Sequence, residues 1–411
     1  MPVDLSTIPV PAQRSSPPSF KRWLFILTLA MVICGTVTLY LWPANKPTQT
    51  PIFWYCFILI PSILWLSLFA LRWLIYTFSD CINDGWDEER EWTLHKEIQR
   101  GQRYVNVLAQ VAHLPQAMTS ASLSMQIIAQ EIVLPSTVEG SSQKVIRQAR
   151  FDDIALPELE RLHNRIVALL ADSALQGALM QLPEPRHLTV SLLAETDEHS
   201  GHIDLSPLWA RVLQTTALPA TASIVQNGGL DMLDKWLDNA ISGRVLLVIA
   251  VRLINEPKDG EGDAAVAMLL QTPVSGKPSS GTIARIHRPE RSKTAEQLTA
   301  AVLQSLHWGD IQPEGIGQIW LTGMGCENQA QSLFSSVDVV FPTVVTAEQT
   351  CDIDIHTGLT GKVSPWLALA VAIDNATLRQ CSQLAMSIPE TDPLLPWFTV
   401  VHPAPVRTIK S

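Results

Sequence analysis

The stretch from Cys351 to Ile373, CDIDIHTGLTGKVSPWLALAVAI, gathers residue types that perform chemistry. A thiol, two carboxylates (Asp352 and Asp354) and an imidazole (His356) precede a glycine-punctuated turn and an apolar helix pattern. Alternation predicts that Asp352, Asp354 and His356 share one face of an edge strand. That face could be catalytic or metal-binding, or simply the solvent side of the strand. The solvent side is favoured, because no second histidine accompanies the first.

A second candidate is Cys326, which follows a glycine at the start of a predicted helix. The helix dipole lowers the pKa of a thiol at such a position, although a small apolar filler at a tight turn is the favoured interpretation. Other motifs are weaker. KDGEGD (258–263) lacks the spacing of a calcium loop, and GKPSSG (276–281) lacks that of a P-loop. The six cysteines form no C-x-x-C pair. We therefore expect no metal and no cofactor.

Two uncharged apolar stretches, residues 23–42 and 52–71, are each long enough to cross a bilayer. They predict a transmembrane hairpin over 22–78, preceded by a Pro- and Ser-rich, disordered segment 1–21. A charged juxtamembrane helix is expected over 79–103. Basic residues flank the hairpin on both outer sides, whereas its loop holds only Lys46. The positive-inside rule then places both termini and the main domain in the cytoplasm.

The charge balance bears on partners. Residues 1–77 hold five basic residues and one acidic residue, so the rest of the chain has 24 basic against 38 acidic. Phosphate backbones are bound by clusters of Lys and Arg, and an acidic domain therefore excludes nucleic acid as the expected partner. Scattered thiols suit a reducing cytoplasm.

From residue 104 to 411 short strand-like apolar runs alternate with amphipathic runs, which is the rhythm of one large α/β domain. Near-continuous apolar runs such as VLLVIAV indicate strands buried on both faces. The predicted strands are 104–114, 125–134, 187–195, 244–253, 264–271, 282–288, 318–324 and 339–345, and the predicted helices are 156–176, 229–242, 294–307, 327–337 and 365–386.

Five stretches, taken in order, resemble the thiolase-like fold and in particular the β-ketoacyl synthase family. They are YVNVLAQVAHLPQA, SIVQNGGLDMLDKWLDNAISGRVLLVIAV, KDGEGDAAVAMLLQTP, QIWLTGMGCENQAQSLFSSV and DIDIHTGLTGKVSPWLALAVAI. They are similar to the opening strand and turn, the nucleophile elbow with its helix and strand, the Gly-Glu-Gly turn, the His-Gly-Thr-Gly-Thr loop, and the Gly-His turn with its Ala-rich helix. The resemblance covers roughly 104–400. It implies a layered α/β/α/β/α domain built from two pseudo-symmetric halves.

The reaction of that family does not carry over. The resemblance implies a nucleophilic cysteine and two histidines that stabilise the carbanion and oxyanion. Counting back from Gly243, the cysteine position falls near Val225, and the first histidine position falls on Thr322. His356 matches the second histidine, but Cys351 replaces the lysine expected five residues before it. No catalytic residue is therefore expected. If the chain were active, Cys326 and His356 would be the candidates.

These features predict a membrane-anchored, catalytically inactive ketosynthase-like protein at the inner membrane of a bacterium. Its expected role is that of a scaffold or accessory subunit, for example an adaptor in a type VI secretion effector cluster. Its expected partners are the lipid bilayer, a secreted effector or ketosynthase-like subunit, and a second copy in a homodimer. Two alternatives stay open: an acyltransferase or condensing enzyme acting on membrane-associated acyl chains, and a membrane-tethered binding module of unrelated α/β fold.

Overall fold

The computed structural model divides into two compact units, one formed by residues 4–98 and the other by residues 99–411 with the first three residues. Each unit is described by itself. The residues that the structure describes are 3–43, 47–117, 121–138, 144–182, 188–196, 205–216, 218, 223–226, 228–239, 241–274, 281–323, 340–341, 349–388 and 395–405.

The first unit is a helical hairpin. Helix α1 (Phe20–Leu41) is followed by a continuous helix over Pro51–Gly101, made of α2 (Pro51–Trp54), the π-helical turn η2 (Tyr55–Leu59) and α3 (Ile60–Gly101). Both are long and apolar enough to cross a membrane. The second predicted span and the predicted juxtamembrane helix are thus parts of one helix. Gly35 of α1 faces the Phe57 ring at a distance that leaves no room for a Cβ.

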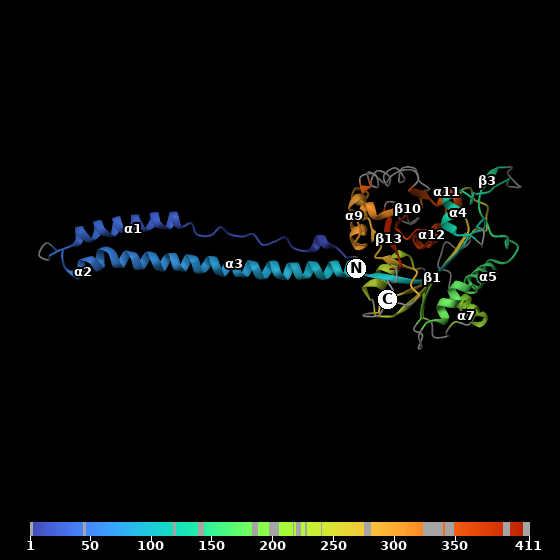
Figure 1. The fold of residues 1–411 in the computed structure, drawn as a ribbon, viewed down its shortest axis with the longest axis horizontal. Helices are drawn as coiled ribbons and strands as arrows, with labels where there is room; N and C mark the ends of the chain where they lie inside the picture. Colours follow the sequence, from blue (N-terminus) through green and yellow to red (C-terminus); the bar gives the residue numbers. More distant parts are fainter. Residues whose placement is uncertain are drawn as a thin grey trace, which may run out of the picture. The chain divides into compact units, whose positions relative to one another are not determined.

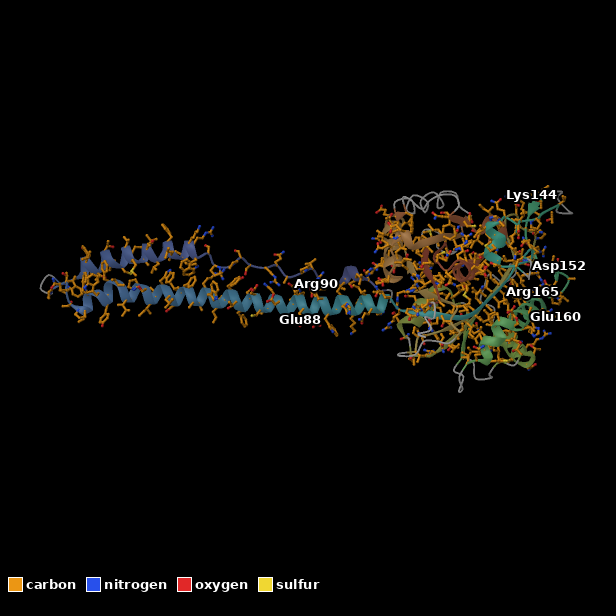
Figure 2. All side chains as sticks on the ribbon, in the orientation of Figure 1. Glu88, Arg90, Lys144, Asp152, Glu160 and Arg165 are labelled. Atoms are coloured by element: carbon orange, nitrogen blue, oxygen red, sulfur yellow. The ribbon has the colours of Figure 1, made fainter. Side chains whose placement is uncertain are left out.

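Residues 9–14, which we call the N-terminal strap, lie extended along α3 although their composition predicts disorder. The backbone N–H of Ala12 donates to Asp87 Oδ1 at 2.9 Å. Arg14 donates to Asp84 Oδ1 at 2.7 Å, and Arg90 Nε donates to the carbonyl of Pro9 at 2.7 Å. Figure 2 labels Arg90 on this helix. The strap and residues 84–90 therefore lie side by side.

The strands of the second unit form two halves with the same strand order. The halves are arranged β5-β4-β6-β7-β1 and β11-β10-β12-β13-β8, and they join where β1 pairs with β8. Counted from the outer strand of each half, β5 or β11, towards the join, neighbouring strands pair parallel, parallel, antiparallel and antiparallel. The strands are β1 (Tyr104–His113), β4 (Leu188–Thr196), β5 (Ser223–Gln226), β6 (Val245–Leu253), β7 (Ala264–Gln271), β8 (Ala284–His287), β10 (Ile316–Thr322), β11 (Thr350–Asp352), β12 (Ser382–Ser387) and β13 (Trp397–Pro403), with β9 (Glu290–Arg291) beside β13 and a separate pair β2 (Ser136–Val138) and β3 (Val145–Arg147).

Side-chain alternation along the strands separates five layers. On β6, Val248 packs with α8 (Leu230–Asp238) and α12 (Ser364–Arg379), whereas Ile249 packs with α5 (Glu158–Leu170), α6 (Ser173–Met180) and α7 (Ser206–Thr215). On β12, Ala385 faces the first group, and Leu384 packs with α9 (Leu298–Trp308). Figure 1 shows α12 inside the body, between α9 and α5. The layered α/β/α/β/α architecture predicted from the sequence is confirmed.

Helix α12 is the central element of this stack. Twelve of its residues are buried, including the whole run from Ser364 to Ile373. A helix that is apolar around its full circumference must be covered on all sides, and here strands of both halves together with α4 (Leu123–Ile128) and α8 cover it.

Three predicted elements differ from the structure. Residues 125–134 are not a strand; they begin in the short helix α4 (Leu123–Ile128), because the Ser122 side chain accepts the N–H of Met125 and caps it. The predicted helix 156–176 is interrupted where Asp172 caps α6. The predicted helix 365–386 ends at Arg379, since Gln380 adopts φ of 53° and the chain then enters β12. The predicted helix 327–337 lies outside the described residues, as does all of the predicted strand 339–345 except 340–341.

Candidate functional site

The stretch CDIDIH does not form one extended face. Strand β11 ends at Asp352, whose Oδ1 accepts the N–H of Asp354 at 3.0 Å, and the short helix α11 (Asp354–Thr357) follows. Ile353 is therefore buried while Ile355 is 69% exposed, so the predicted alternation is wrong. Burial, and then the Asp352 carboxylate, raise the pKa of the Cys351 thiol to about 11. Cys351 is thus a neutral thiol near pH 7 and a poor nucleophile.

His356 is held in one orientation by the backbone. Its Nδ1 lies 3.0 Å from the carbonyl oxygen of Ile132, which can only accept a hydrogen bond. The neutral ring therefore carries its proton on Nδ1 and presents Nε2 as an acceptor. A condensing enzyme needs Nε2–H donors that stabilise a developing negative charge. In this tautomer His356 cannot supply one.

The turn after His356 packs against the motif KDGEGD (258–263). The N–H of Gly262 donates to the carbonyl of Leu359 at 3.1 Å, and the N–H of Leu359 donates to that of Gly260 at 2.8 Å. A Cβ on Gly262 would stand 1.9 Å from the carbonyl oxygen of Thr357, so only glycine fits. Two motifs that the sequence offers as candidate sites are therefore structural partners of each other.

The carboxylates around this contact are all engaged. Arg252 donates to Glu261 at 2.5 Å, and Glu195 accepts the N–H of Lys362 at 2.7 Å. Asp263 accepts two backbone N–H groups, at 3.0 and 2.6 Å, and burial raises its pKa to about 6. Among the described residues no group of three or more His, Cys, Asp or Glu side chains could hold a metal ion. These hydrogen bonds and ion pairs hold the turn after His356 against residues 258–263.

Val225, the position that the resemblance assigns to the nucleophile, has a side chain without a nucleophilic atom. Val225 lies on edge strand β5 and pairs with Ser191 of β4. In the loop that leads from β5 to α8, Gly228 packs so closely that a Cβ would stand 2.5 Å from Ser191 Oγ. The Trp366 indole of α12 is fully buried and donates Nε1–H to the Gly228 carbonyl at 3.3 Å. This contact between α12 and the loop could not be found from sequence spacing.

Ser191, within β4, and Thr322, the last residue of β10, carry buried hydroxyl groups that no described residue activates. Ser191 Oγ and Thr322 Oγ1 have no hydrogen-bond partner among the described residues, so no base there abstracts their protons. Thr322 ends β10, where the N–H of Ile353 donates to Leu321. The structure thus brings Thr322 and the stretch 351–356 to one edge of the second half. Cys326 lies outside the described residues.

Two halves of identical strand order around two central helices define the thiolase-like, ketosynthase-like fold. One solved structure of this kind is the ketosynthase from module 1 of the bacillaene synthase of Bacillus amyloliquefaciens FZB42, with a TM-score of 0.54 and 11% identity over 74% of this chain and 77% of that one. Another is the ishigamide ketosynthase/chain length factor, with a TM-score of 0.53 and 11% identity over 74% of this chain and 100% of that one. No family model and no curated protein matches the sequence.

Proposed function

We propose that this chain is a membrane-anchored, non-catalytic ketosynthase-like protein that serves as a scaffold or accessory subunit. The observation that carries the proposal is the pair of substitutions at the family's reacting positions, Val225 for the cysteine and Thr322 for the first histidine. Valine has no nucleophilic atom, and threonine does not exchange protons near pH 7. The Nδ1-bonded tautomer of His356 supports it independently.

The anchor in this proposal is the helical hairpin. Helix α1 and the first part of the helix Pro51–Gly101 have the length and hydropathy of membrane spans. Basic residues outside the hairpin favour the inner membrane of a bacterium with both termini in the cytoplasm. The contacts of the N-terminal strap with residues 84–90 support a hairpin with both ends on one side, and the basic residues are the argument for which side that is.

The partner in this proposal is a protein. A fold that keeps its five layers while its reacting groups are lost still presents a large, defined surface. A secreted effector of a type VI system, a ketosynthase-like subunit or a second copy of the chain would suit that surface. Cross-linking in intact membranes, followed by purification of the full chain and mass spectrometry, would identify which of them binds.

A test of inactivity uses the full chain in detergent, incubated with octanoyl and malonyl thioesters and analysed by intact mass, with an active ketosynthase in parallel. We expect no adduct on this chain and a stoichiometric acyl adduct on the active enzyme. An adduct that disappears in Cys326→Ser would overturn the proposal and indicate a condensing enzyme or acyltransferase that uses Cys326. In that case His356→Ala should slow transfer without changing the site of acylation.

A further inference from the structure

The outer layer of the first half contains a cavity of about 410 Å³. It lies between α5, α6 and the carboxyl end of α7, and Leu188, the first residue of β4, also lines it. Its described lining residues are Val167, Leu170, Ala171, Gln176, Leu179, Met180, Leu182, Leu188, Thr215, Thr216 and Leu218. We propose that this cavity binds an uncharged molecule with a hydrocarbon chain.

The lining sets the chemical class of the ligand. Eight of the lining residues are apolar, and none of those described carries a charge. The hydroxyls of Thr215 and Thr216 both donate to the carbonyl of Val212, at 2.9 and 2.8 Å, and so are not available as donors to a ligand. The described lining can therefore stabilise an apolar chain by removing it from water. Apart from the amide of Gln176 and the two threonine hydroxyls it presents only apolar side chains, and among the described residues no charged side chain is there to offset the desolvation of a charge. Its volume lies within the range of small-molecule sites.

The cavity is separate from the position of a ketosynthase reaction. Sites in parallel sheets lie at the carboxyl ends of the strands, whereas Leu188 is at the amino end of β4. Leu188 also faces the outer helices, while the Ser191 hydroxyl faces Gly228 of the central layer. At the rim of the cavity, Met180 is 72% exposed. The inference does not rest on the proposed function.

Photolabelling of the full chain in lipid nanodiscs tests this site. The probe is a decanol that carries a diazirine, and labelled peptides are quantified by mass spectrometry. We expect labels on peptides of α5 and α6 and also on the apolar helices, where probe dissolved in lipid reacts. Ala171→Trp places an indole in the cavity and should reduce the α5 and α6 labels at least tenfold, while labels on the apolar helices stay constant.

Ala174→Trp is the matched control, because Ala174 is an exposed residue of α6 that does not line the cavity. It should label like the wild type. A second readout needs no variant: excess decanol should compete with the probe at least tenfold better than excess decanoate at pH 8. Equal competition by decanoate, or labels on α5 and α6 that neither Ala171→Trp nor decanol reduces, would overturn the proposal.

Discussion

At the scale of single residues, Trp308 contacts two ionisable side chains, Glu290 and His287, whose pKa values are shifted in opposite directions. Its indole N–H donates to Glu290 at 2.8 Å, and its carbonyl accepts from His287 at 3.0 Å. Burial raises the pKa of Glu290 to about 7. Burial, with the nearby His402, lowers the pKa of His287 to about 3. Both groups are therefore held in their neutral forms over a wide pH range.

We predict that Glu290→Gln stabilises the protein above pH 7. The folded-state pKa of Glu290 is raised from its ordinary value of 4.5 to about 7, so between these values only the folded state holds the proton and stability falls as pH rises. Glutamine keeps an acceptor for Trp308 without the charge. The free energy of unfolding at pH 8 should rise by about 1–2 kcal/mol, measured by urea titration in detergent.

His287 gives this experiment its internal control. Its lowered pKa means that stability falls as pH decreases from 6.5 towards 3. The two slopes oppose each other between about pH 4.5 and 6.5, so removing one of them should change the pH dependence of stability in that range. In Glu290→Gln the effect of His287 should dominate, so the free energy of unfolding should rise as pH rises from 5 to 7. If the free energy of unfolding of this variant still falls as pH rises over this range, the assignment is wrong.

Replacement of Trp366 by alanine should be strongly destabilising without restoring chemistry. The indole is fully buried in the central layer, and removing such a side chain typically costs about 3–5 kcal/mol. Because Val225 and Thr322 remain, we expect no acylation by thioesters. Trp92→Ala, at a position that is 58% exposed, is the control and should leave unfolding almost unchanged. A loss below about 1 kcal/mol for Trp366→Ala would contradict this packing.

Motif order alone assigns Val225, Thr322 and His356 to the reacting positions that the resemblance implies, but it does not predict what holds these residues in place. The hydrogen bond from Trp366 to Gly228 spans 138 residues, and that from His356 to Ile132 spans 224. Such pairs are created by the fold. The tautomer of His356, which decides what the ring can do, was therefore not predictable.

At the scale of elements, salt bridges connect α8 to the rest of the α/β domain. Arg288 is 1% exposed and pairs with Asp234 and Asp238, which lie one turn apart on α8. Arg100 also pairs with Asp238, at 2.6 Å. Burial raises the pKa of Asp238, but hydrogen bonds from Arg100 and Arg288 outweigh it and bring the value to about 2.

Arg288→Ala should therefore be among the most destabilising substitutions in this chain. It leaves the buried Asp234 carboxylate without its cation and Asp238 with Arg100 alone, and the loss of one partner of a buried ion pair costs about 3–5 kcal/mol. Urea titration of the full chain measures the loss, and acidification should recover part of it by protonating Asp234. On the same helix, Lys235→Ala removes an exposed pair with Asp231 and should cost less than about 0.5 kcal/mol. Similar losses in both variants would contradict the role of burial.

The strands with long apolar runs could be predicted from the sequence, whereas the short strands could not. VLLVIAV and AAVAMLLQ identified β6 and β7, because strands covered on both faces have continuous apolar sequences. SQLAMS was assigned to the preceding helix, yet it forms β12 because β10 and β13 offer partners on both sides. β5 has four residues and β13 contains a proline, so local sequence hardly indicates either.

At the scale of the molecule, the proposed membrane hairpin and its proposed orientation can be tested directly. Reporters fused before Met1 and after Ser411 should both be active in the cytoplasm, whereas a reporter placed in the loop near Lys46 should be active only outside it. Activity of the Ser411 fusion outside the cytoplasm would contradict the orientation. A cytoplasmic signal from the loop would instead contradict the hairpin.

The architecture of the body was predicted from the order of its motifs. The repetition of one strand order in two halves was implied by that resemblance, and the pairings confirm it. No single stretch of sequence encodes it. The join between the halves, where β1 pairs with β8, is a long-range contact that only the folded chain displays.

That join has a consequence for biosynthesis. β1 is the first strand of the body to leave the ribosome, yet Tyr104 pairs with His287, about 180 residues later. At 5–20 residues per second, its partner appears on the order of 10–40 s after it. Until β7 and then β8 have emerged, this apolar strand lacks both of its partners, and it directly follows a long helix whose first part is apolar enough to span a membrane. The nascent chain would therefore depend on a chaperone more than its size alone suggests, since strands that wait for distant partners are prone to aggregation.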